Sequence, residues 1–159
     1  MTQIATTREQ AQRLLDCGVK AETADMCCYD RTGILYSNSF DSLPTPAKEE
    51  YFPAWSLSRL FDLLPKKLTA GIRVHELNMG VEPYDGLFYI RYINTRSDTD
   101  DLDSYTDAPD PIEACVQMIE WLVKHDYKLN SIEKCPNYEF DADKVKESLK
   151  EQGQKKNEL

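Results

Sequence analysis

The stretch PIEACVQMIEWLVK at residues 111–124 decides the fold, because its apolar side chains recur with the spacing of a helix. Five of them fall on one stripe: Ile112, Cys115, Val116, Ile119 and Val123. Asp110 can serve as the N-cap and Pro111 suits the first helical position, so the start of the helix is well defined. We expect the helix to end near Lys124 or His125.

Two shorter helices are predicted earlier in the chain. The first runs from about Arg8 to Cys17, where Thr7 and Gln10 form a capping-box pattern. The second lies between Ser56, which can cap it, and Pro65, which ends it. Its apolar stripe consists of Leu57, Leu60, Phe61 and Leu64. Both helices should bury one face against a shared core.

Alternating and apolar segments predict two hairpins. The first pairs residues 26–30 with 34–38, and the second pairs 72–79 with 87–94. Residues 39–53 contain three prolines, so we expect a surface loop there.

The predicted order of elements is α-β-β-α-β-β-α-α, with a last helix that begins near Asp141. This order indicates an α+β fold in which two hairpins form an antiparallel sheet of about four strands, packed with three to four helices. At 159 residues the chain fits a single domain over residues 1–150, and residues 151–159 form a polar tail expected to fray.

The composition limits the classes of partner. The net charge of -9 disfavours binding to nucleic acid, which depends largely on Lys and Arg. No apolar run approaches the roughly 20 residues needed to span a bilayer. The N-terminus lacks the apolar region of a signal peptide, so we expect no membrane contact and a cytoplasmic location.

An acidic segment separates the second hairpin from the helix at 111–124. It contains Asp98, Asp100, Asp101, Asp103, Asp107 and Asp110, and no Lys or Arg occurs between Arg96 and Lys124. An EF-hand requires Gly at its sixth position, and no register of this segment supplies one. A solvated loop that leads into a capped helix is therefore favoured, with an acidic recognition surface or a calcium site as alternatives.

Thiol chemistry has little support in the sequence. The five cysteines form no CxxC spacing, and we expect them to be reduced: Cys17, Cys27, Cys28, Cys115 and Cys135. Only His75 and His125 could complete a zinc site. No metal, cofactor or catalytic residue is therefore assigned. A small enzyme with a cysteine or carboxylate pocket, between the sheet and residues 39–53, remains an alternative.

Aromatic residues offer two further surfaces. Helix 111–124 is apolar beyond one stripe. We expect the C-terminal segment or a loop to cover the shoulder at Trp121; the alternative is a homodimer or partner interface centred on Trp121 and Met118. Tyr84, Tyr89, Tyr92, Phe88 and Arg91 resemble a base-stacking surface. The charge balance favours cross-strand packing for that group instead.

Four segments carry a resemblance to a known family: QAQRLLDCG (10–18), TADM (23–26), PAWSLSRLFDLLP (53–65) and PIEACVQMIEWLV (111–123). The chain resembles small uncharacterised proteins encoded in prophages and mobile elements of anaerobic gut bacteria. The resemblance extends to about residue 130, and the charged tail after Tyr127 departs from shorter members. It implies a cytoplasmic bacterial or phage protein and transfers no site, because its motifs are helix caps and core faces.

The sequence favours a non-enzymatic acidic module that binds a protein partner, as an accessory protein of a mobile element. The residues expected to make the contact are Asp98, Asp100, Asp101, Asp103, Asp107, Met118 and Trp121. One specific version is an anti-restriction protein, whose carboxylates mimic DNA phosphates. The alternatives are the small enzyme and a calcium-binding regulator.

Overall fold

A computed structural model describes residues 3–131. Its α-helices are α1 (Arg8–Asp16), α2 (Thr45–Lys48), α3 (Leu57–Leu63) and α4 (Pro111–Lys124), with single 3-10 turns at Ala21–Thr23 and Phe40–Ser42. Its strands are β1 (Met26–Tyr29), β2 (Leu35–Tyr36), β3 (Tyr51–Ala54), β4 (Lys67–Ala70), β5 (Arg73–Val81), β6 (Phe88–Asn94) and β7 (Thr106–Ala108). The helix predicted from Asp141 and the tail at 151–159 lie outside the described residues.

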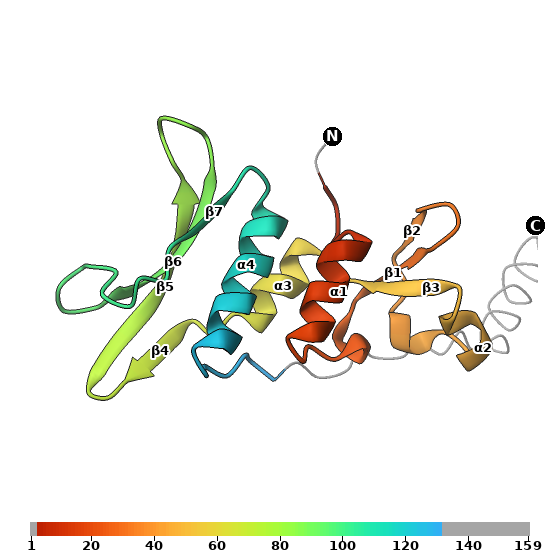
Figure 1. Ribbon diagram of the computed structural model, residues 1–159, viewed down its shortest axis with the longest axis horizontal. Coiled ribbons are helices and arrows are strands. Elements are labelled where there is room, and N and C mark those ends of the chain that lie inside the picture. Colours follow the sequence, from red (N-terminus) through yellow and green to blue (C-terminus); the bar gives the residue numbers. More distant parts are fainter. Residues whose placement is uncertain (1–2, 132–159) are drawn as a thin grey trace, which may run out of the picture.

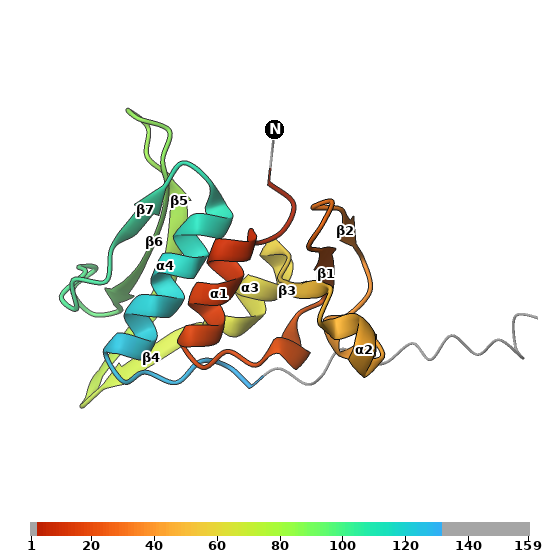
Figure 2. The same cartoon turned by 45° about the vertical axis from the view of Figure 1, so that its right-hand side comes forward.

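The α+β class is confirmed, but the two predicted hairpins lie in separate antiparallel sheets. One sheet has the order β2-β1-β3 and the other the order β4-β5-β6-β7. Helices α1, α3 and α4 lie between the two sheets (Figures 1 and 2). Each hairpin is extended by a further strand of its own sheet: β3 pairs with β1, and β4 pairs with β5.

The prediction that residues 39–53 form a surface loop was right about the surface, since residues 39–52 are not buried, but it missed two short elements. This segment contains α2 and leads into β3, in which Pro53 lies opposite Cys27 of β1. Strand β3 lies at the edge of its sheet, with a partner on one side only. A proline, which has no amide hydrogen to donate, is tolerated at such an edge. Strands β4, of four residues, and β7, of three residues, were also missed.

The predicted helix boundaries are confirmed by their caps. Thr7 and Gln10 form the capping box of α1, and Ser56 accepts a hydrogen bond from the Arg59 amide at the start of α3. Asp110 accepts one from the Ile112 amide at the start of α4. These side chains satisfy amide groups that have no partner within the helix.

Helix α4 forms the centre of the core. Seven of its residues are buried: Ile112, Ala114, Cys115, Val116, Met118, Ile119 and Leu122. It contacts α1, α3, β6 and β7. Arg13 on α1 forms ion pairs with Glu113, at 2.8 Å, and with Glu120, both on α4. One face of the four-stranded sheet is therefore covered by α4, and the site described next lies on the opposite face.

Candidate functional site

The outer face of the four-stranded sheet is the candidate site. Side chains alternate along β6, so Ile90 and Tyr92 are buried on the α4 side while Tyr89 and Arg91 point to the other side. Within residues 3–131 no helix covers that second face, as both views of the fold show (Figures 1 and 2). Among the described residues, Tyr89 and Arg91 on this face are half-buried.

A stack of three side chains occupies this face. Tyr89 and Tyr105 are stacked, with ring centroids 5.8 Å apart and an interplanar angle of 18°. The guanidinium of Arg91 lies 5.2 Å from the centroid of Tyr89. Gly80 on β5 makes the arrangement possible, because a Cβ atom there would lie 2.9 Å from the Tyr89 hydroxyl. The rings therefore lie close to the backbone of the sheet.

Three carboxylates surround Tyr105. Glu82 accepts a hydrogen bond of 2.9 Å from the Tyr105 hydroxyl, and Asp107 on β7 lies opposite Tyr89. Partial burial, the bond to Glu82 and the negative charges of Asp107 and Asp85 together raise the pKa of Tyr105 to about 12. We call the set of Tyr89, Tyr105, Glu82, Asp85 and Asp107 the acidic-aromatic face. Stacked rings beside carboxylates suit the binding of a guanidinium or ammonium group.

The acidic segment predicted as a solvated loop is a hydrogen-bonded turn. Asp100 accepts hydrogen bonds of 2.9 Å from both the amide and the hydroxyl of Ser104. Asp98 and Asp103 are exposed and have positive φ angles of 54° and 53°. Of the predicted contact residues in this segment, only Asp107 belongs to the acidic-aromatic face.

Asp101 is bound to a buried histidine. Its carboxylate lies 2.5 Å from Nε2 of His75 and accepts a bond of 2.9 Å from Asn94. Hydrogen bonds from Asn94 and His75, aided by the charge of Arg73, hold the pKa of Asp101 below its usual value. Asp100 and Asp101 thus hold other side chains and an amide of the turn. The described residues contain no group of three or more His, Cys, Asp or Glu that could hold a metal.

The predicted interface at Met118 and Trp121 needs correction. Met118 is fully buried, so it cannot contact a partner. Trp121 stacks on His125 at 4.3 Å and on Tyr127 at 5.6 Å. Leu129 also packs against the core, which means that the chain after α4 returns over this shoulder.

The described cysteines are protected thiols. Cys27, Cys28 and Cys115 are buried, and burial raises the pKa of each, to about 12 for Cys115. Partial burial and the charge of Glu120 also raise the pKa of Cys17. A thiol with a raised pKa forms little thiolate at neutral pH, so none of these four is suited to be a nucleophile.

We expect slow alkylation of all four thiols in the folded protein. Iodoacetamide at pH 7 should modify Cys17, Cys27, Cys28 and Cys115 at least about tenfold more slowly than in urea, because only the thiolate reacts and the buried thiols are shielded. Peptide mass spectrometry over time measures each rate. A single thiol that reacts faster in the folded state than in urea would support the enzyme alternative.

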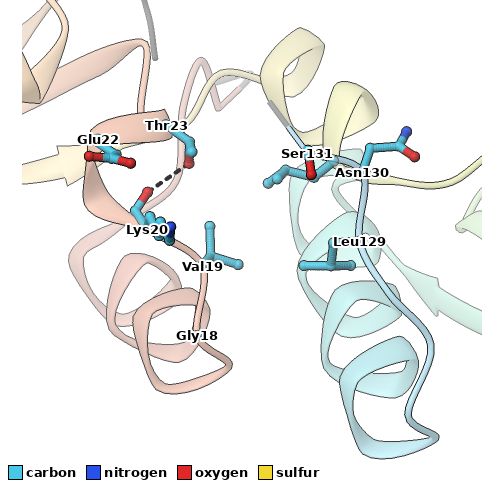
Figure 3. A pocket seen from close by; sticks show the side chains of 9 residues that line it. Gly18, Val19, Lys20, Glu22, Thr23, Leu129, Asn130 and Ser131 are labelled. Atoms are coloured by element: carbon cyan, nitrogen blue, oxygen red, sulfur yellow. Dashed lines mark hydrogen bonds between the residues drawn. The ribbon is translucent and has the colours of Figure 1, made fainter. Parts of the chain in front are cut away.

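A pocket of about 280 Å³ opens between the turn after α1 and the chain after α4. Residues 18–20, 22 and 23 line one side and residues 129–131 the other (Figure 3). The polar groups identified there maintain the fold: Thr23 donates to the carbonyl of Lys20, and Asn130 donates to the carbonyls of Asp62 and Leu64 at the end of α3. The pocket lies away from residues 39–53, where the enzyme alternative would place it.

The comparisons with known proteins add no relative. No family model, curated protein or solved structure matches the chain. Within the described part, no helix is long and apolar enough to cross a bilayer.

Sequence reasoning did not select Glu82 or Tyr105 as site residues. The alternation along β6 was the available signal, since it places Tyr89 and Arg91 on one face.

Proposed function

We propose that this chain is a non-enzymatic protein-interaction module whose acidic-aromatic face binds a basic, arginine-containing segment of a partner protein. The observation that carries the proposal is the stacked pair of Tyr89 and Tyr105 beside three carboxylates on an uncovered sheet face. Arg91 already rests on Tyr89 in the arrangement that an incoming arginine would adopt on Tyr105.

The charge of the chain supports the same class of partner. A net charge of -9 attracts basic proteins over distances up to the Debye length, about 8 Å at physiological ionic strength. At contact, a guanidinium can stack on a ring and bind a carboxylate through two parallel hydrogen bonds, a geometry that lysine does not provide. We therefore expect arginine to be preferred over lysine.

We further propose, as the sequence led us to expect, that the chain acts as an accessory protein of a mobile element in the cytoplasm. A basic partner could itself be a DNA-binding protein, whose groove the carboxylates would occupy in place of DNA. Competition between this chain and duplex DNA for such a partner distinguishes DNA mimicry from other acidic recognition.

Binding of short peptides tests the proposal. A fluorescein-labelled peptide of alternating Arg and Gly should bind more tightly than its Lys and Glu counterparts, and lose affinity as salt rises. The variants Tyr105→Ala and the triple Glu82→Gln, Asp85→Asn, Asp107→Asn should each weaken binding about tenfold. Fluorescence anisotropy at 50 and 500 mM NaCl gives the affinities.

The matched control is Tyr36→Ala on the other sheet. Tyr36 is 42% exposed and Tyr105 is 39% exposed, so the two substitutions remove similar accessible aromatic surface. Equal losses from both variants, or equal affinity for the Arg and Glu peptides, would exclude the acidic-aromatic face as the binding surface.

A further inference from the structure

Strand β5 has an open edge over its second half. Strand β4 pairs only with residues 73–76 of β5, and the carbonyl of Lys66 accepts the Leu77 amide at 3.0 Å. Beyond this point residues 78–81 pair with β6 on one side, and no described strand lies on the other. Figure 1 shows β5 continuing past the end of β4 toward the 82–87 turn.

The hydrogen-bond pattern identifies the groups at this edge. The Val74 carbonyl accepts a hydrogen bond from the Thr95 amide, and the Glu82 amide donates one to the Leu87 carbonyl. The backbone groups of even-numbered residues of β5 therefore point toward β6. The Leu77 amide bonds in the opposite direction. The amide and carbonyl groups of Met79 and Val81 therefore point away from β6. They form a row of peptide groups available to another strand.

Apolar side chains accompany these groups. Val81 is 60% exposed, Met79 is 36% exposed, and Tyr84 in the following turn is 100% exposed. The sequence from Asn78 to Val81 has none of the lysines or prolines that commonly block an exposed edge. The edge is thus suited to pairing.

We propose that this edge pairs antiparallel with the same edge of a second copy of the chain, around a two-fold axis near Gly80. Charge complementarity favours this occupant: Lys66 lies at one end of the edge, beside Leu77, and Glu82 and Asp85 lie at the other. A two-fold axis brings the basic end of each copy to the acidic end of its partner, as an isologous interface requires.

The backbone at the axis fits the same arrangement. Gly80 has no side chain, and directly opposed residues without hydrogen bonds approach to about 4.5 Å between Cα atoms. Pro83 has no amide hydrogen, so the pairing between the two copies ends before Pro83 of one copy reaches Lys66 of the other.

Pairing at an edge extends the sheet in its own plane. The stacked rings of Tyr89 and Tyr105 therefore stay open, while Glu82 and Asp85 belong both to the acidic-aromatic face and to the acidic end of the dimer interface.

Sedimentation equilibrium of the full chain from about 1 to 200 μM tests the proposal. We expect a reversible monomer–dimer equilibrium. Val81→Pro removes an edge amide without removing a bond to β6, and should weaken the dimer at least about tenfold. Val81→Thr, which keeps the amide, should weaken it less. Circular dichroism establishes that both variants are folded.

Exchanging the charges at the two ends of the interface provides a second test. Lys66→Glu places like charges at both ends of the interface and should weaken the dimer about tenfold, while Lys66→Glu combined with Glu82→Lys should restore it. A chain that stays monomeric at 200 μM overturns the proposal. A dimer unaffected by folded Val81→Pro, or one not restored by the charge exchange, also overturns it.

Discussion

Replacing Trp55 with alanine is expected to lower the free energy of unfolding by about 3–5 kcal/mol, the largest effect of any single substitution considered. Trp55 is fully buried and belongs to the hydrophobic core. Its indole nitrogen donates a bond of 3.0 Å to the Thr23 hydroxyl, and its amide donates to the Thr6 hydroxyl. Alanine leaves a cavity and removes the donor to Thr23. Urea unfolding followed by far-ultraviolet circular dichroism measures the change.

Two controls separate packing from hydrogen bonding at this position. Trp55→Phe keeps much of the ring volume but loses the donor, and should cost less than alanine. Thr23→Ala removes only the acceptor and should cost about 1–3 kcal/mol, since the indole nitrogen is left buried without a partner. A Trp55→Ala cost below about 1 kcal/mol would show that Trp55 is not a core residue.

The success of sequence reasoning depended on the range of each interaction. The boundaries of α1, α3 and α4 were predicted correctly because caps and apolar stripes act within one or two turns of a helix. Strand β3 was missed because only its pairing with β1, more than twenty residues away, makes residues 51–54 extended. Strand β7 was hidden because its three residues follow an acidic segment and pair only with β6.

The candidate site shows the same division between local and distant information. A run of aspartates is visible in the sequence, but the structural duties of Asp100 and Asp101 depend on Ser104, His75 and Asn94. Likewise, Tyr105 becomes part of a site because Tyr89 stacks on it, and Tyr89 has room there because residue 80, on a different strand, is a glycine. Residues that share a surface can be distant in sequence, and composition does not reveal which of them meet.

Replacing His75 with alanine is expected to lower the free energy of unfolding by about 2–4 kcal/mol. His75 is fully buried on β5, and its Nε2 lies 2.5 Å from Asp101. Removing the imidazole leaves a cavity and takes one hydrogen bond from the carboxylate that orders the 94–104 turn. Val74→Thr, at the exposed neighbouring position, should change stability by no more than about 0.5 kcal/mol. Urea unfolding at pH 7 measures both, and equal effects would contradict a supporting role for His75.

The partner of His75 also sets a pH dependence. Since Asn94 and His75 hold the folded-state pKa of Asp101 below its ordinary value of 3.8, the unfolded chain binds this proton more readily than the folded one. The resulting stability is complete above pH 3.8 and is lost as the pH falls through the folded pKa. Asp101→Asn cannot ionise, so its deficit in unfolding free energy relative to the wild type should be largest near neutral pH and shrink below pH 4. A deficit that grows toward acid pH would mean that the folded state raises this pKa, contrary to the geometry of the turn.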